Sequence, residues 1–306
     1  MSQHLSRRRF LLAAAASGLA TGLPAETLRW QGTALGARAQ ILMDHPGAAR
    51  LTALARAEIT RLERIFSLYD AGSELSRLNR AGVLAAPSFE LLDCLSLARH
   101  VHRVTEGRFD PTVQPLWAAL AEARSAGQAL PPARLQRARA LVGFDRVTFD
   151  SDAVRLGAGQ ALTLNGIAQG YVADRVAARL KAEGLADVLV DTGEIAARGA
   201  PSGQEGWGVS IAHSAERVVL RDRALATSHT YGTVLGADGR QGHILRPFGG
   251  MPVARRQVSV SAKGAGLADA LSTGLSLVED RATAQRLVAG EKGVRLEAFL
   301  EGPSAA

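Results

Sequence analysis

Apolar residues recur at two different spacings along the chain, and the spacing changes about halfway. Over 48–68 they return every three or four positions, as on one face of an α-helix. A second helix is expected from Ser88, a residue type that caps helix N-termini, to Gly107. Residues 121–140 are rich in Ala, Arg and Pro and predict an exposed helical connection.

Short strands and glycine-rich turns follow from Phe144 onward, and a strand hairpin around Gly32 and Gly36 is expected before the helices. The expected strands of the second half lie in RVTFDSDAVRL, ALTLNG, DVLVDTGEIAARG, GWGVSIAH, ERVVLRDRALATS and QVSVSAKG. Two helices interrupt them, at Tyr171 to Glu183 and at Leu267 to Val278. Strands and helices do not alternate regularly, as a doubly wound parallel sheet requires. The predicted class is therefore α+β, a single compact domain with a mixed or antiparallel sheet and flanking helices.

The chain begins with SRRRFLLAAAASGLATGLPA, in which paired arginines precede a short apolar stretch and then small residues. This order is typical of a twin-arginine (Tat) export signal. It predicts a signal peptide over 1–25, a mature domain over 26–306 and a periplasmic location. The alternative is an N-terminal membrane anchor, but the apolar stretch is too short and too rich in alanine to span a bilayer stably.

Composition excludes a disordered protein, because 47% of the residues are hydrophobic and only 21% are charged. The net charge of +7 comes from 36 Lys and Arg against 29 Asp and Glu, and it is scattered outside the N-terminal arginines. Such a distribution disfavours nucleic-acid binding and is compatible with a polyanionic small ligand. Cys94 is the single cysteine, so an intrachain disulfide and a cysteine-based zinc or haem site are excluded. Its apolar neighbours predict a buried side chain.

The segment NGIAQGYVADRVAARLKAEG, residues 165–184, places Gly166 and Gly170 directly before an amphipathic helix. Glycines allow close approach of the backbone to a ligand, and the unpaired N–H groups at a helix start suit phosphate. The alternative is that both glycines only form a tight turn into the helix.

Asp269 and Thr273 are four residues apart in the segment VSVSAKGAGLADALSTGLSLV. On a helix their oxygens project from the same face, one turn apart. A carboxylate and a hydroxyl are hard oxygen ligands of the kind that Mg²⁺ prefers, with phosphate oxygens and water completing its shell. The alternative is that Asp269 only interacts with the helix dipole.

Two histidines flank an expected hairpin in ATSHTYGTVLGADGRQGHILRP, with a turn at Asp238 and Gly239 and His243 on the following strand. His229 and His243 could approach each other, and either could act as a general base or be an ordinary histidine. GRFDPTVQPLW, residues 107–117, is expected to be a rigid, extended passage because of its two prolines. The chain has no P-loop, no GxSxG nucleophile elbow and no GxGxxG after a strand.

Eight segments, taken together and in their order along the chain, resemble the ApbE family of FAD:protein FMN transferases. They are GTALGA (32–37), FSLYDAGSELSRLNR (66–80), GRFDPTVQPLW (107–117), LNGIAQGYVADRV (164–176), VLVDTGEIAARG (188–199), ATS (226–228), GHILRP (242–247) and ADALST (268–273). The chain is most similar to the periplasmic, NosX-like type. The resemblance implies an ApbE-like, T-fold-related domain.

The resemblance also implies an activity: the enzyme binds FAD and Mg²⁺ and transfers FMN to a threonine hydroxyl of a redox protein, releasing AMP. Asp269 and Thr273 fall on the family's metal-ligand positions, and Gly166 falls on the position that contributes a backbone carbonyl. His243 is the candidate for activating the acceptor hydroxyl, and with Asp269 it forms the expected catalytic pair. The residues on or next to flavin-nucleotide contact positions are Leu35, Tyr69, Arg108, Phe109, Asp110, Thr163, Gln169 and Leu245.

Three residues depart from the family's pattern. Thr163 replaces an acidic residue, Gln169 replaces a lysine, and Arg246 replaces the aspartate of HIxDP. Losing the lysine removes a counter-charge for phosphate, and arginine is not its equivalent. Two alternatives therefore stay open: an exported protein that binds and delivers FAD, and a magnesium-dependent FAD pyrophosphatase. The expected partners are FAD, the Tat machinery and an acceptor from a respiratory or nitrous-oxide-reductase maturation complex, without nucleic acid.

Overall fold

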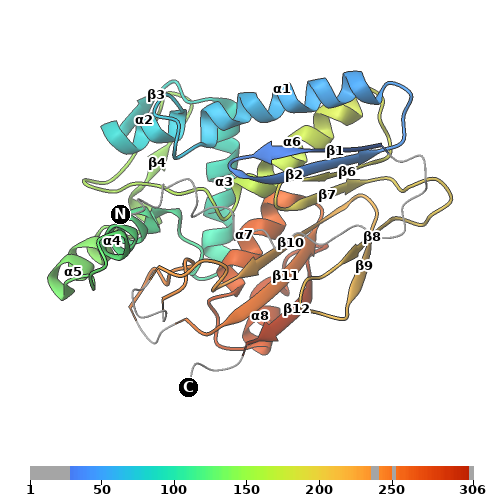
Figure 1. Ribbon diagram of the computed structural model, residues 1–306. Coiled ribbons are helices and arrows are strands. Elements are labelled where there is room, and N and C mark those ends of the chain that lie inside the picture. Colours follow the sequence, from blue (N-terminus) through green and yellow to red (C-terminus); the bar gives the residue numbers. More distant parts are fainter. Residues whose placement is uncertain (1–27, 236–240, 250–252, 303–306) are drawn as a thin grey trace, which may run out of the picture.

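A computed structural model describes residues 28–235, 241–249 and 253–302, and an antiparallel seven-stranded sheet lies at its centre (Figure 1). The strands lie in the order β1-β2-β6-β7-β10-β11-β12. Their bounds are Leu28–Ala34 (β1), Ala37–Met43 (β2), Val188–Asp191 (β6), Ile195–Arg198 (β7), Arg223–His229 (β10), Arg256–Ala262 (β11) and Arg295–Glu301 (β12). Every neighbouring pair is antiparallel, from Leu28 opposite Met43 in the first hairpin to Arg256 opposite Glu301 in the last pair.

The helices are α1 (Ala48–Phe66), α2 (Glu74–Ala81), α3 (Phe89–Val104), α4 (Gln114–Ser125), α5 (Pro132–Ala140), α6 (Ala168–Ala182), α7 (Ala265–Leu275) and α8 (Arg281–Val288). Of these, α1, α6, α7 and α8 pack on one face of the main sheet, and α3 packs on α1 and α7. The main core lies between the sheet and these helices and contains the fully buried Ile41 and Met43 of β2. Leu42, between them, belongs to a second core on the opposite face, as the two-residue period of a strand requires.

A two-stranded hairpin, β8 (Trp207–Ser210) with β9 (Arg217–Leu220), packs on that opposite face. Its Trp207 is 1% exposed and packs among residues of β6, β7 and β10. A small sheet of β3 (Val83–Ala85), β5 (Ala153–Arg155) and β4 (Thr148–Phe149) lies apart from the main sheet, and α4 and α5 project beside it (Figure 1). The cavity described below lies between this helical part and the central sheet.

The closest helix pair is α6 and α7, and each helix binds a carboxylate of the other. The N–H of Gly170 in α6 donates to Asp269 Oδ2 at 3.1 Å, and the N–H of Gly266 in α7 donates to Asp174 Oδ2 at 3.0 Å. A Cβ placed on Gly170 would lie 2.2 Å from the carbonyl oxygen of Ala265, so only glycine permits this approach. This contact fixes the position of Asp269 relative to the first turn of α6.

Most predicted elements are confirmed, including the α+β class, the first hairpin and the helices at 48–68 and 88–107. ALTLNG is a loop rather than a strand, because its backbone bonds to other segments, for example through Leu162 N–H to Asn79 Oδ1. The prediction of an extended passage over 107–117 is also wrong. Pro111–Val113 is a 3₁₀ turn, and α4 begins at Gln114 with Pro115 in its first turn, where no N–H is required.

The structure also contains elements that the sequence did not predict: α2, α8, β3 and β12. The expected turn at Asp238 and Gly239 and the signal over 1–25 lie outside the described residues. His243 itself is not on a regular strand, although Gly242 forms an isolated bridge with Val234. Within the described part of the chain, no helix combines the length and apolar character needed to cross a membrane.

Candidate functional site

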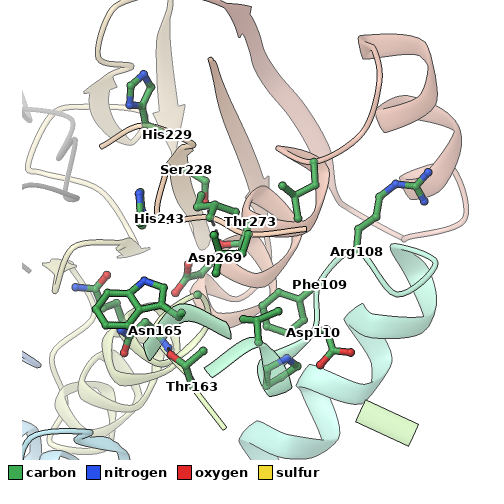
Figure 2. A pocket seen from close by; sticks show the side chains of 18 of the residues that line it. Arg108, Phe109, Asp110, Thr163, Asn165, Ser228, His229, His243, Asp269 and Thr273 are labelled. Atoms are coloured by element: carbon green, nitrogen blue, oxygen red, sulfur yellow. Dashed lines mark hydrogen bonds between the residues drawn. The ribbon is translucent and has the colours of Figure 1, made fainter. Parts of the chain in front are cut away.

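A cavity of about 140 Å³ opens where α6, α7, β10 and the loops before and after them meet. Figure 2 shows Asp269, Thr273 and Ser228 grouped at its centre, with His243 and His229 on one side and Phe109 on another. Ten of the predicted site residues line it: Arg108, Phe109, Asp110, Thr163, Gly166, Gln169, His243, Leu245, Asp269 and Thr273. The chain thus brings together residues from sequence positions more than 160 apart.

Asp269 and Thr273 lie on the cavity side of α7, as their four-residue spacing predicts. The hydroxyl of Thr273 is 3.2 Å from Ser228 Oγ of β10, which in turn is 2.8 Å from Ser272 Oγ. Gly166 faces the same hydroxyl, because a Cβ placed on it would lie 2.9 Å from Thr273 Oγ1. The backbone before α6 and the α7 hydroxyl therefore enclose a space that any side chain at 166 would fill.

The two glycines of the 165–184 segment have different roles. Gly166 lines the cavity, whereas Gly170 is buried against Ala265 of α7 and gives its N–H to Asp269. The interpretation of Gly170 as a point of ligand approach is therefore wrong. Part of the positive end of α6 is already taken by a carboxylate of the protein.

Three carboxyl groups are buried at this end of the sheet. Burial raises the pKa of Asp269 to about 7, against the opposing effect of its bond from Gly170. Burial, together with the charge of Asp269, raises the pKa of Glu194 well above its usual range. Burial likewise raises the pKa of Asp191 to about 6. None of the three has a lysine, arginine or histidine nitrogen within 4.0 Å among the described residues.

These groups fit a divalent cation with oxygen ligands. Asp269 is 3% exposed, has one oxygen bonded to Gly170 and lacks a cationic partner in the described chain. The space between Gly166 and Thr273 supplies a hydroxyl and backbone next to that carboxylate. The described chain has no group of three or more His, Cys, Asp and Glu side chains that could hold a metal ion, so the protein donors at this cavity are few. The donor set suits Mg²⁺, which takes few protein ligands and keeps water or phosphate oxygens.

His243 presents a neutral imidazole to the cavity. Burial, with a smaller contribution from the nearby His229, lowers its pKa to about 4 against the opposing effect of its contact with the Thr233 backbone. The ring is held by Thr233, whose N–H lies 3.2 Å and whose carbonyl oxygen lies 3.3 Å from Nδ1. His229 also lines the cavity, and burial lowers its pKa. Both imidazoles are therefore uncharged at neutral pH. The two histidines lie near enough for His229 to affect the pKa of His243, which agrees with the expectation that they approach each other.

Arg108 and Asp110 use their side chains within the protein. The guanidinium of Arg108 contacts Glu106 at 2.8 Å and Glu279 at 3.5 Å, and it points away from Asp269 (Figure 2). Asp110 Oδ1 accepts from the Thr112 N–H at 2.7 Å, and its Oδ2 accepts from the Phe144 N–H at 3.1 Å. The charged groups of both residues are therefore already engaged within the protein, and Phe109 between them, 4% exposed, lines the cavity.

Tyr69 and Leu35 lie outside this cavity. Tyr69 is 46% exposed and lines an adjoining cavity of about 560 Å³, which shares Trp117 and Asn165 with the first. Leu35 forms the tight turn of the first hairpin with a φ of 50°, and its N–H donates to Glu63 Oε1. Leu35 lines neither cavity.

Gln169, in the position where a lysine is expected from the resemblance, lies flat on Gly193. A Cβ on Gly193 would lie 2.8 Å from Gln169 Nε2, and the φ of Gly193 is 106°. The carbonyl of Gln169 accepts from the Thr192 hydroxyl at 2.7 Å. This side chain offers an amide, not a charge, to the cavity.

Sequence reasoning missed Glu194, Asn165 and Ser228 as cavity residues. A signal was present for Glu194, because a single charged residue lies in the otherwise small or apolar stretch TGEIAA. Its significance depends on β7 lying beside β10, which local spacing does not reveal. Cys94 is buried as predicted, and burial raises the pKa of its thiol.

The fold and the cavity define an α+β protein with a small-molecule cavity where α6, α7 and β10 meet, lined by the buried carboxyl groups of Asp269 and Glu194. The ApbE family model matches residues 32–299, and the chain belongs to the ApbE family. Over 303 aligned residues it is 32% identical to an FAD:protein FMN transferase of Vibrio cholerae, covering 90% of each chain. It is 31% identical to an FAD:protein FMN transferase of Haemophilus influenzae, covering 71% of this chain and 69% of that protein.

Solved structures agree with this membership. The flavin transferase ApbE from Vibrio cholerae superimposes with a TM-score of 0.76 at 25% identity, covering 92% of this chain and 98% of that one. The apo form of the Pseudomonas stutzeri flavinyl transferase ApbE also gives a TM-score of 0.76, at 26% identity, covering 86% and 87%. The family resemblance and the ApbE-like fold expected from the sequence are confirmed.

Proposed function

We propose that this chain is an FAD:protein FMN transferase that depends on Mg²⁺ and releases AMP. The flavin-transferase class agrees with the names of its relatives. In the reaction, a threonine oxygen of an acceptor protein forms a bond to the phosphorus of the FMN half of FAD. The bond from that phosphorus to the AMP oxygen breaks, and the threonine proton passes to a base. Atoms and charge balance without any oxidant or reductant.

The observation that carries the proposal is the arrangement of Asp269, Thr273 and Gly166 around one space. A bound Mg²⁺ would neutralise the negative charge of the diphosphate, including the charge that develops on the AMP leaving group. Asp269 holds one side of this space and is fixed by the α6 N–H of Gly170. Thr273 and the Gly166 backbone hold the other. Because the described cavity offers no lysine and its Arg108 is paired with acids, the diphosphate needs a counter-charge of this kind.

His243 is suited to take the proton of the acceptor hydroxyl. Its pKa of about 4 keeps the imidazole neutral at pH 7, so a nitrogen lone pair is available. The backbone of Thr233 engages Nδ1, which leaves Nε2 as the nitrogen for the acceptor. The negative charge of a bound diphosphate would raise the pKa of this histidine and improve it as a base.

The size of the cavities supports a dinucleotide rather than a mononucleotide. About 140 Å³ around Asp269 accommodates little more than a diphosphate, and the adjoining 560 Å³ beside Tyr69 and Trp117 has aromatic walls for a ring system. Asn165 lies at the junction of the two. FAD would extend through both, with its diphosphate beside Gly166.

The test uses the purified chain, FAD, Mg²⁺ and a protein that one of the named transferases flavinylates. Intact-protein mass spectrometry should show the acceptor gaining one FMN, and chromatography should show one AMP released per adduct. Asp269→Asn and chelation of Mg²⁺ should each abolish both products. FMN and AMP without an adduct would instead support the FAD pyrophosphatase. FAD retained without Mg²⁺ and without turnover would support the delivery protein.

The proposed setting is the periplasm, reached through the Tat pathway. The motivation is the twin-arginine segment before residue 26. Replacing Arg7 and Arg8 together by lysine should leave the precursor in the cytoplasm, and N-terminal sequencing of the exported wild type should begin near residue 26. A NosX-like role predicts that the flavinylated acceptor belongs to a respiratory complex, which mass spectrometry of membrane proteins from cells with and without this chain would identify.

A further inference from the structure

A second carboxylate, Glu194, faces the same cavity as Asp269 from a different element. It lies at the end of the turn between β6 and β7, whereas Asp269 lies on α7. Glu194 is 8% exposed and its side chain reaches β10, where Oε2 accepts from the Thr227 N–H at 3.0 Å. The other oxygen, Oε1, has no hydrogen-bond partner among the described residues, where Thr227 is the partner of this side chain. A residue more than nine-tenths buried that lines the cavity therefore keeps one unpartnered oxygen.

The sheet fixes the position of this oxygen. Glu194 is bracketed by Gly193, whose N–H donates to Asp191 Oδ1 at 2.9 Å, and by Ile195, which pairs with Leu225 of β10. The Thr192 N–H donates to the Glu194 carbonyl at 3.1 Å and closes the turn. Backbone held at both ends and a bonded Oε2 leave the carboxylate little freedom. Such a group is preorganised toward whatever occupies the cavity.

The charges that surround the cavity determine which kind of ligand it can hold. Two buried carboxyl groups with no cationic side chain beside them in the described chain leave the diphosphate that the proposed function brings into the cavity without a counter-charge. A divalent cation between them would supply that charge, favour the ionised form of both groups and bind the diphosphate as well. Mg²⁺ commonly keeps several water molecules, and a carboxylate that accepts hydrogen bonds from those waters orients the ion.

We propose that Glu194 is a further positioning residue of the cation site, whose free oxygen meets the ion or one of its waters opposite Asp269. This inference rests on the proposed function, because it takes the same cation and the same diphosphate as given. It assigns the charge of the site to two elements, α7 and the β6–β7 turn, rather than to α7 alone. The ion thereby connects the helical layer to the sheet.

The test measures cation affinity rather than turnover. Mn²⁺ is titrated into the full, metal-free chain with one equivalent of FAD, and free Mn²⁺ is followed by electron paramagnetic resonance against a blank of FAD alone. Glu194→Gln keeps the length of the side chain and an acceptor for the Thr227 N–H, so the fold should be retained. Its affinity for Mn²⁺ should fall roughly 10- to 100-fold. Glu194→Asp, which keeps the charge, should recover part of that loss.

Asp191→Asn is the matched control. Asp191 is buried three residues earlier in the same hairpin, but it does not line the cavity and both of its oxygens are hydrogen-bonded. Its replacement should leave Mn²⁺ affinity close to that of the wild type. An unchanged affinity in Glu194→Gln, together with a lost affinity in Asp269→Asn, would overturn the inference and leave the proposed function intact. No Mn²⁺ binding by the wild type beyond the FAD blank would overturn both, and the FMN-adduct assay reports separately on transfer.

Discussion

Two glycines four residues apart should respond to the same substitution in opposite ways. Gly166 faces the hydroxyl of Thr273 in the cavity, and Gly170 faces the backbone of α7. Gly166→Ala should therefore reduce cation binding and transfer while preserving stability. Gly170→Ala should reduce stability. The pair separates the functional role of the segment from its packing role with the smallest change that a side chain allows.

The magnitudes follow from what each new methyl group would meet. At 166 the methyl lies 2.9 Å from Thr273 Oγ1 and 3.1 Å from Thr273 Cγ2, which are side-chain atoms that can rotate aside. The cost is offset by about 0.4–1 kcal/mol from the lower entropy of the unfolded chain, so stability changes little. Rotation of Thr273, however, removes its hydroxyl from the proposed cation site, and a loss of transfer of about tenfold or more is expected.

At 170 the methyl lies 2.2 Å from the carbonyl oxygen and 2.4 Å from the carbonyl carbon of Ala265. These are backbone atoms of α7, so two helices must separate by about an ångström. Overpacking of this kind costs about 1–3 kcal/mol and occasionally more, while better helix propensity returns up to about 1 kcal/mol. A net loss of about 2 kcal/mol lowers Tm by roughly 4–8 °C in a domain of this size.

The assay compares Tm from calorimetry, with and without Mg²⁺ and FAD, and the yield of FMN adduct by mass spectrometry. The expected pattern is a ligand-dependent rise of Tm in Gly170→Ala that is absent in Gly166→Ala. Two results would refute the reasoning: full transfer activity in Gly166→Ala, or a Gly170→Ala protein as stable as the wild type. The first would remove Gly166 from the site, and the second would mean that α6 and α7 do not approach as described.

Three further predictions concern single groups. Because the pKa of His243 is lowered to about 4, the rate of FMN transfer should stay level from pH 8 down to about 5.5 instead of falling below 6.5, provided that Mg²⁺ is saturating and so keeps Asp269 ionised and offsets the diphosphate charge. His243→Ala should lower the rate roughly 10²- to 10⁴-fold while retaining FAD. A rate that halves near pH 6.5 at saturating Mg²⁺ would contradict this. Burial raises the pKa of Asp191 from 3.8 to about 6, so the folded protein favours the protonated side chain. Its contribution to the free energy of unfolding is fully present below pH 3.8 and is lost as the pH rises through 6, a change of about 3 kcal/mol. Urea unfolding should then show Asp191→Asn gaining stability relative to the wild type between pH 4 and pH 7.5, and a constant difference would exclude it. Arg256 is 4% exposed and donates to the Val278 and Glu279 carbonyls and to the more exposed Glu301, so Arg256→Met leaves carbonyl acceptors without a partner and should cost about 1–3 kcal/mol in urea unfolding. The exposed Arg50→Met should change the free energy of unfolding by less than about 1 kcal/mol.

Local spacing in the sequence determined the parts of this protein that depend on neighbours in the chain. The four-residue interval between Asp269 and Thr273 fixes both on one face of α7, because 3.6 residues complete a helical turn. Ser88 begins α3 because its hydroxyl accepts from the Leu91 N–H. The order of eight short segments also indicated the ApbE family, since such an order is a property of the sequence itself.

Only the tertiary structure decided which surfaces these elements present to one another. Gly170 and Gly166 look equivalent in the sequence, yet α7 covers one and leaves the other open to the cavity. Glu194 joins Asp269 because β7 lies beside β10, a pairing that joins segments about 30 residues apart. Contacts of this kind depend on how sheet order and helix packing bring distant segments together. No local periodicity encodes these contacts, so Glu194 and Asp269 come together in one cavity only when the chain is folded.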